Sequence, residues 1–414
     1  MSPRWVFPLV VFAAALSVRW GYLFGIAGVG GELKGDAMAY HAHAVNLLTR
    51  GVYADSQGFS AVRMPGYPLF LAAVYSVFGP SPAAVQIVQC VLDAGTCVLL
   101  GLVASWILGT RMGWFCGLSA AIYYDLFSPC ALLYSEPFCL FLWAIFFCAL
   151  YYPKISSERR ALAVGLILGA VFLVRPEALL FAPMVALCLP KVWKGTSWRS
   201  VGFCLLLFFS VGVLPWTLRN WQVLGKPAVT TSVSHYNAFL GLWLPAHQIW
   251  GVPAPVVTVT GELERDAAYA QELKKLRKEL SWKKIILAHG YDFFTLFYPF
   301  LPQYDVTFVL LVPLWVWGLY KSREVKEFWP LSILFLYLAA AYTLFGGPVS
   351  RYRQNFTPSL VLLSGLGLKS LQERFQKVSL NWGLGGWAGL QGLIWIFHPQ
   401  IRQWALSLKE WVWR

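Results

Sequence analysis

A chain of 414 residues in which 58% are hydrophobic and 13% are charged lies far from the composition of a soluble domain. The formal net charge of +14 comes from basic residues scattered between apolar runs, which argues against nucleic acid as the partner. Together with the mean hydropathy of +0.59, this composition predicts an all-α, polytopic integral membrane protein.

The predicted elements are apolar runs that recur along the whole chain. The longer runs meet the ~20 residues that a spanning helix needs, and we expect a bundle of about 10–12 helices. The first run is too long for the apolar part of a typical cleaved signal peptide, so we expect it to be retained as the first helix. The runs are 5–29, 82–108, 113–127, 137–152, 161–190, 201–218, 296–320, 328–345, 354–368 and 382–398.

The first long loop, 30–81, holds an acid and a base close to the membrane surface. Asp36 begins an amphipathic helical pattern, and Arg63 precedes a Pro/Gly/Tyr turn that opens a second helix. That helix, 66–79, has only about 14 apolar positions, so we interpret it as an interfacial or re-entrant helix of the same loop. We therefore expect a helical first outer loop with Asp36 and Arg63 on one side of the membrane.

Later in the chain, the run 161–190 is interrupted by Arg175-Pro176-Glu177, which predicts two helices that meet at the outer surface. A second large outer loop, 219–295, contains a charged amphipathic helix that begins near residue 262. We predict a catalytic module over 1–368, followed by a terminal helix and a Trp-rich interfacial tail over 369–414, the tail carrying Trp404, Trp411 and Trp413.

The charges predict the topology. With the N-terminus in the cytoplasm, the basic clusters fall in the inside loops. Most outside polar residues then sit at helix ends beside apolar runs, where ionisable groups are costly and tend to mark function. Each also has a structural interpretation as a helix cap, a local ion pair or a membrane-surface anchor. The outside residues are Asp36, Arg63, Asp125, Glu136, Arg175, Glu177, Arg219, His235, Asn237, His247, Arg351 and Arg353.

Cysteine and histidine patterns give no firm cofactor. The eight cysteines nearly all lie in or beside apolar runs without a CxxC spacing, so we interpret them as core residues. His235 and His247 lack the close spacing of a metal-binding pair. A divalent metal ion held by one of them stays an open alternative.

Several ordered motifs carry a family resemblance. They are Gly35-Asp36 with Tyr40, Arg63 with Pro65-Gly66-Tyr67-Pro68, Ser135-Glu136-Pro137, Arg175-Pro176-Glu177, Pro215-Trp216 with Arg219-Asn220, and Ser350-Arg351-Tyr352-Arg353. In this order the chain resembles bacterial membrane glycosyltransferases of the GT-C superfamily. The group that includes protein mannosyltransferases, aminoarabinose transferases and rhizobial lipopolysaccharide transferases is the most similar.

The resemblance implies a GT-C-like fold and an enzyme that takes a hexose or pentose from a polyprenyl-phosphate carrier. The sugar would pass with inversion to a glycan, lipid or protein acceptor on the periplasmic or exterior face of a bacterial inner membrane. It implies Asp36 as general base. Cations beside the lipid phosphate would stabilise the leaving group. The residues implied to bind substrate are Tyr40, Arg63, Tyr67, Glu136, Arg175, Glu177, Arg219, Asn220, Arg351 and Tyr352.

Two departures from the family pattern bear on these expectations. Ala37 follows Asp36 where several relatives carry a second acid, and Val62 stands where some relatives have a metal-binding Glu. Two other functions stay open. One is a polymerase- or ligase-like enzyme acting on preassembled glycans, which the large outer loop 219–295 would suit, and the other is a lipid or solute transporter. A transporter typically shows paired halves, and no internal repeat is visible.

Overall fold

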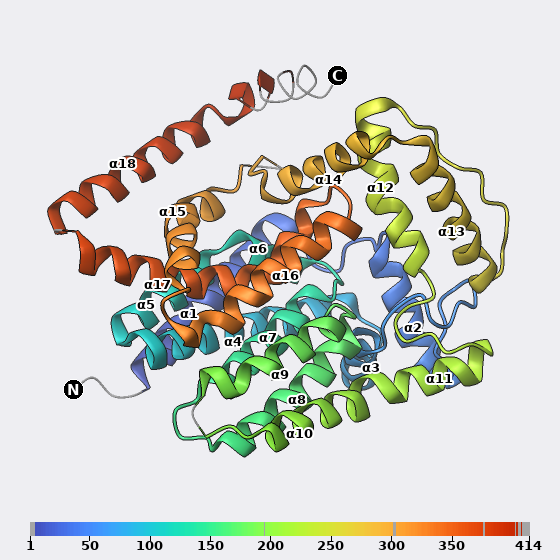
Figure 1. The fold of residues 1–414 in the computed structure, drawn as a ribbon, viewed down its shortest axis with the longest axis horizontal. Helices are drawn as coiled ribbons and strands as arrows, with labels where there is room; N and C mark the ends of the chain where they lie inside the picture. The colour runs from blue at the N-terminus through green and yellow to red at the C-terminus, as the bar shows by residue number, and fades with distance from the viewer. Residues whose placement is uncertain are drawn as a thin grey trace. The chain divides into compact units, whose positions relative to one another are not determined.

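The computed structural model describes residues 5–193, 195–300, 304–375, 377–401, 403–404 and 407. Within these residues every regular element is a helix and there is no β-strand (Figure 1). The prediction of an all-α chain is confirmed.

The helices follow one another with short connections in the first half of the chain. They are α1 (Val6–Tyr22, continued by a π-helical turn Leu23–Ala27), α2 (Asp36–Arg50), α3 (Gly66–Phe78), α4 (Pro82–Leu108), α5 (Thr110–Ile122), α6 (Tyr124–Phe127), α7 (Glu136–Tyr151), α8 (Ser157–Val174), α9 (Ala178–Val192), α10 (Trp198–Phe208, continued by a π-helical turn Phe209–Val213) and α11 (Leu214–Leu224).

The second half contains α12 (Ser234–Trp250), α13 (Glu262–Glu279), α14 (Trp282–Phe297), α15 (Val306–Lys321), α16 (Trp329–Phe345), α17 (Thr357–Arg374) and α18 (Lys377–Ile396). Short 3₁₀ turns lie at Ser128–Ala131, Lys326–Phe328 and Ser350–Phe356. The predicted break in 161–190 is confirmed, because α8 ends at Val174 and α9 begins at Ala178.

Four helical stretches among the described residues are long and apolar enough to cross a membrane: Val6–Ala27, Pro82–Leu108, Trp198–Leu224 and Lys326–Phe345. Shorter apolar helices accompany them, among them α3. With 13 residues, α3 is shorter than the ~20 residues of a spanning helix, in line with its interpretation as part of the first loop. The chain is an integral membrane protein.

The chain divides into two compact units, which are described separately. The first comprises 1–231, 314–334 and 357–369, and the second comprises 232–313, 335–356 and 370–414. These units do not correspond to the predicted division into a catalytic module over 1–368 and a terminal segment over 369–414, which describes function and stays a prediction.

Two fully buried charged side chains meet inside the first unit. The Arg19 Nε of α1 donates to Asp93 Oδ2 of α4 over 2.7 Å, and neither side chain is accessible to solvent. Arg19 Nη1 also donates to the carbonyl oxygens of Ala15 and Ala121. A buried ion pair with additional hydrogen bonds compensates much of its desolvation, so this pair ties α1 to α4.

Helices α8 and α10 pack side by side in the first unit (Figure 1). A Cβ atom added at Gly165 would lie 2.3 Å from the Cys204 carbonyl oxygen, and one added at Gly212 would lie 2.9 Å from Gly169 Cα. These close approaches require glycine, and they bring the two backbones into direct contact. Because 165 faces 204 and 169 faces 212, the two helices run in the same direction.

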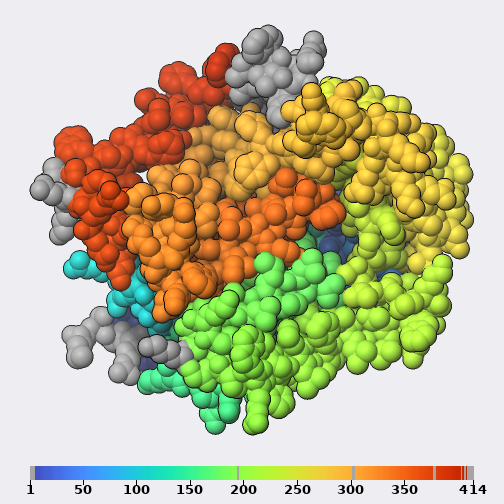
Figure 2. All heavy atoms as spheres, in the orientation of Figure 1, coloured from blue at the N-terminus to red at the C-terminus, as the bar shows by residue number. Residues whose placement is uncertain are grey.

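In the second unit, α12, α13 and α14 enclose a small apolar core. Its buried members include Phe239 and Leu242 of α12, Leu273 and Leu276 of α13, and Ala288 of α14. Atoms of α12 and α13 (yellow) form a continuous surface (Figure 2). The predicted charged helix from residue 262 is therefore α13, with Leu273 and Leu276 on its buried side. In the predicted tail, Trp411 and Trp413 lie outside the described residues.

Candidate active site

The first turn of α2 presents the candidate general base. Gly35 precedes the helix with φ +55°, a left-handed conformation that glycine adopts readily, and its conformation sets the direction in which α2 begins. Asp36 is the first helical residue, not the cap, and its Oδ1 lies 2.5 Å from Nη2 of Arg63. The two side chains keep 32% and 29% of their surface exposed. The pair is therefore formed but open to solvent or substrate.

Aromatic residues of the first loop surround Arg63. Its guanidinium lies 5.6 Å from the ring centre of Tyr40, which meets Tyr67 edge to face at 4.8 Å. The Tyr67 hydroxyl is fully buried and donates to Gln89 of α4 over 2.7 Å. Tyr53 donates to the Arg63 carbonyl oxygen over 3.0 Å. These contacts fix the orientation of the cation relative to Asp36.

A second group of charged side chains lies where α7 begins and α8 ends, with Arg175 between two glutamates. Arg175 Nη2 lies 2.8 Å from Glu136 Oε1, and Arg175 Nη1 lies 3.4 Å from Glu177 Oε1. Glu136 is 1% exposed, while Arg175 keeps 13%. Ser135 precedes α7 without a side-chain hydrogen bond to the helix, whereas Pro137 stands in the first turn as expected.

Tyr40 lies within electrostatic reach of both ion pairs. Burial raises the pKa of the Tyr40 hydroxyl, Arg63 and Arg175 lower it, and Asp36 and Glu136 raise it. The two pairs therefore belong to one electrostatic environment around a phenol that keeps its proton at neutral pH.

Close packing at Gly66 brings α3 to the end of α8. A Cβ atom at this position would lie 2.7 Å from Val174 Cγ2 and 2.8 Å from the Leu173 carbonyl oxygen. Only glycine permits this approach, and Arg175 follows Val174 directly. The Pro/Gly/Tyr turn thus joins the segment that carries Arg63 to the segment that carries Arg175.

Arg219 and Asn220 hold loops in position. Arg219 donates to the carbonyl oxygens of Ser60 and Tyr53 over 2.6 and 3.0 Å. Asn220 is fully buried and donates to the Ala228 carbonyl oxygen over 2.8 Å. Arg219 contacts the same loop as Arg63, so it supports the candidate site through the backbone of that loop.

The two remaining candidates for substrate binding, Arg351 and Tyr352, belong to the second unit. The Tyr352 ring stacks on Tyr342 with centroids 4.7 Å apart. Their neighbour Arg353 is buried and pairs with Asp305 over 2.5 Å. Arg353 therefore has a packing role in its own unit.

The two histidines considered for metal binding make other contacts. His235 Nδ1 lies 2.7 Å from Asp266 Oδ2, and His247 Nδ1 lies 2.7 Å from the Val252 carbonyl oxygen. Among the residues that the structure describes, no three His, Cys, Asp or Glu side chains gather in a way that suits a metal ion. A metal site stays a prediction.

The sequence analysis did not identify two buried residues that make hydrogen bonds, Gln89 and Asp305. Gln89 accepts from Tyr67, and Asp305 accepts from the Phe308 backbone N–H at the start of α15 as well as from Arg353. An Asp directly before an apolar run is a recognisable helix-start signal, so Asp305 was accessible to sequence reasoning. Gln89 was not, because its partner lies on another helix.

Comparison with known proteins gives structural matches alone. No protein-family model and no curated protein matches the sequence. The chain resembles the oligosaccharyltransferase of Archaeoglobus fulgidus tethered to an acceptor peptide (TM-score 0.56, 12% identity, 96% of this chain and 54% of that one). It also resembles AglB from the same organism in complex with an inhibitory peptide and a dolichol-phosphate (TM-score 0.55, 11% identity, 96% and 55%).

A further match is ArnT from Cupriavidus metallidurans bound to undecaprenyl phosphate, with a TM-score of 0.43, 13% identity and coverage of 90% of this chain and 79% of that one. The chain spans about half the length of the oligosaccharyltransferase, and at such low identity the likeness concerns the fold. It confirms the expected fold, a helical membrane fold similar to that of the archaeal oligosaccharyltransferase.

Proposed function

We propose that this protein is a membrane glycosyltransferase that moves a hexose or pentose from a polyprenyl-phosphate carrier to a glycan, lipid or protein acceptor on the non-cytoplasmic face. The observation that supports it most is the contact between Asp36 and Arg63, each about one-third exposed, in a GT-C-like fold. The archaeal oligosaccharyltransferase of similar fold is seen in complex with dolichol-phosphate, a lipid phosphate.

The proposed reaction is a single displacement at the anomeric carbon. The Asp36 carboxylate accepts the proton of the acceptor hydroxyl as the new oxygen–carbon bond forms. The bond between the anomeric carbon and the phosphate oxygen breaks, and its electron pair leaves with the lipid phosphate. Attack from the opposite side inverts the configuration of the sugar.

Arg63 has two anionic partners in this scheme. In the structure it pairs with Asp36, so a carboxylate oxygen is engaged by the guanidinium. A donor phosphate near Arg63 competes for the same guanidinium, whose planar N–H groups suit phosphate oxygens. Donor binding then releases the carboxylate at the moment that a base is required, and Arg63 stabilises the charge that develops on the leaving phosphate.

The Glu136–Arg175–Glu177 group is proposed to bind the sugar. Carboxylates and a guanidinium hydrogen-bond readily to sugar hydroxyls, and Arg175 retains a small exposed surface. Arg351 and Tyr352 stay proposed contacts for the lipid phosphate.

The test compares purified full-length wild type with Asp36→Asn in transfer from a panel of radiolabelled polyprenyl-phosphate sugars. Loss of the base is expected to slow transfer about 10²–10⁴-fold. Glu32→Gln is the matched control, since Glu32 is an exposed acid close by in sequence that pairs with Lys34. Equal rates for wild type and Asp36→Asn would refute the general-base assignment.

A second measurement separates transfer from transport. If wild type consumes none of the donors while the flux of labelled lipid across proteoliposomes depends on the protein, the transporter alternative is correct. Products longer than one added sugar would favour the polymerase- or ligase-like alternative.

A further inference from the structure

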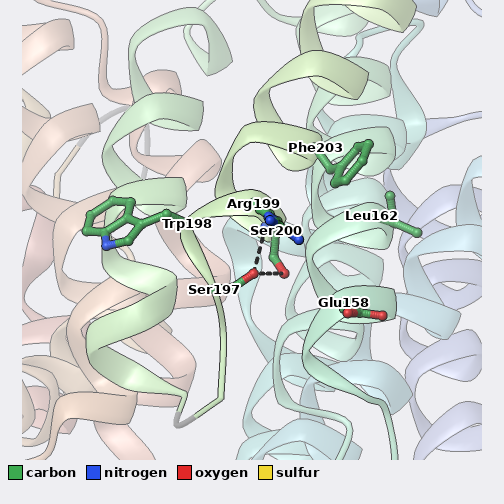
Figure 3. Close-up of a pocket in the computed structure, with 7 residues that line it drawn as sticks. All are labelled: Glu158, Leu162, Ser197, Trp198, Arg199, Ser200 and Phe203. Atoms are coloured by element: carbon green, nitrogen blue, oxygen red, sulfur yellow. Dashed lines mark hydrogen bonds between the residues drawn. The ribbon is translucent and has the colours of Figure 1, made fainter.

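A pocket of about 680 Å³ opens between the first turns of α8 and α10 (Figure 3). Leu162 and Phe203 form its apolar part, and Trp198 stands at its edge. All three apolar side chains are exposed, with 38%, 55% and 66% of their surface accessible. The pocket lies within the first unit and shares no residue with the candidate active site.

The packing of the two helices explains the position of the pocket. Glycines bring α8 and α10 into backbone contact from Gly165 onward. Toward their N-termini the pocket opens between the two helices. Because the helices run in the same direction, both positive dipole ends lie at this pocket.

Polar groups at the start of α10 also line the pocket. Ser197 Oγ accepts from the Ser200 backbone N–H over 3.2 Å and bonds to Ser200 Oγ at the same distance (Figure 3). Arg199 lines the pocket, and its side chain is exposed. Within the described residues, Arg199 makes no ion pair.

The surrounding loops are basic. Lys154 precedes α8, Arg159 lies in its first turn, and Lys191 lies near the end of α9. Arg160, by contrast, is buried, donates to the carbonyl oxygen of Leu150 and stacks on Trp193. Positive loops next to membrane helices mark the cytoplasmic side, where the leaflet carries anionic lipid.

We propose that this pocket binds an anionic phospholipid with a hydroxylated headgroup, of the phosphatidylglycerol type. The phosphate contacts Arg199 and the N-terminus of α10, and an acyl chain lies along Leu162 and Phe203. Glu158 is the one acid in the lining, and it accepts a hydrogen bond from a headgroup hydroxyl. Trp198 occupies the headgroup level, as tryptophan does at membrane interfaces.

Native mass spectrometry of the full-length protein in detergent tests the proposal by counting bound lipids. Phosphatidylglycerol is titrated against wild type, Arg199→Gln and Arg159→Gln. Arg159 is the matched control because it is exposed, directly follows the lining residue Glu158 and is not itself part of the lining. Arg199→Gln is expected to weaken binding about fivefold, the scale of one basic residue at a membrane surface, while Arg159→Gln leaves it unchanged.

Equal binding by wild type and Arg199→Gln would overturn the proposal, as would an equal loss in both variants, which would indicate diffuse attraction. Millimolar inorganic phosphate is expected not to displace the lipid, and displacement would assign the site to free phosphate. Glu158→Ala is expected to weaken phosphatidylglycerol but not phosphatidic acid, which has no headgroup hydroxyl. If both lipids respond alike, the role of Glu158 is wrong.

Discussion

Replacing Asp93 by Ala removes the carboxylate that pairs with the buried guanidinium of Arg19. Both side chains are fully buried and the Nε–Oδ2 distance is 2.7 Å, so the variant leaves a positive charge without its counterion. Breaking a buried pair in this way costs about 3–5 kcal/mol. Arg19 keeps its hydrogen bonds to Ala15 and Ala121, which places the expected loss near the lower end, about 3 kcal/mol.

The double variant Arg19→Leu/Asp93→Leu gives the sharper comparison. It removes both charges and replaces them with apolar groups, which is often neutral or stabilising for a buried pair. We therefore expect the double variant to be more stable than Asp93→Ala alone. This order is the opposite of what simple addition of two unfavourable substitutions predicts.

Thermal unfolding in detergent, followed with a thiol-reactive fluorogenic dye, measures the effect. Cys90, Cys97 and Cys116 are fully buried, so the dye reports the loss of the native core. All variants are scanned at one rate, since such unfolding is under kinetic control. A midpoint for Asp93→Ala equal to that of wild type, or a double variant less stable than the single one, would refute the reasoning.

Three further predictions concern other parts of the chain. Burial raises the pKa of the Asp292 carboxyl from 3.8 to about 6, so the folded protein holds this proton more tightly than the unfolded chain. This proton stabilises the folded state fully below pH ~4, and the stabilisation, roughly 3 kcal/mol in all, is lost as the pH rises through ~6. In the Asp292→Asn variant, the unfolding midpoint should therefore depend less on pH over this range. Gly66→Ala places a Cβ 2.7 Å from Val174 Cγ2, so it should destabilise the fold by about 1–3 kcal/mol and slow the sugar transfer that we propose. Gly202→Ala, with no atom within 4 Å of the added Cβ, should do neither. Asn220→Ala removes a buried donor from the Ala228 carbonyl oxygen and should cost about 1–3 kcal/mol in the same thermal assay; an unchanged midpoint would show that water replaces the amide.

Features that depend on local sequence could be predicted with confidence. The break at Arg175-Pro176-Glu177 follows from the proline, and the helix that begins at Asp36 follows from its apolar spacing; both are observed. Asp36 is not the helix cap, because Gly35 holds that position and the carboxylate contacts Arg63. That choice depends on the course of the loop from 51 to 65, which Arg219 of a distant helix holds through backbone carbonyls.

Contacts between side chains of different helices could not be predicted from the spacing of residues in the sequence. Glu136 and Arg175 are 39 positions apart in the chain, and both were selected as polar groups at helix ends. Their 2.8 Å contact follows from the packing of α7 against α8. The sequence indicates which charges are costly, and the tertiary structure decides which of them neutralise each other.

The exposure of the ion pairs determines which of them can take part in chemistry. Arg19 and Asp93 exclude solvent entirely, so neither can exchange its partner for a substrate without a large desolvation cost. Asp36 and Arg63 retain about a third of their side-chain surface, and a pair in that setting is worth only about 1 kcal/mol. In the reaction that we propose, the donor is a phosphodiester whose single negative charge is shared by two oxygens, and it is expected to displace the carboxylate from Arg63 at little cost. The weakness of this contact suits Asp36 to the role that we propose for it, a base that must be free when the donor is bound. It distinguishes Asp36 from Asp93, an acid that holds two helices together.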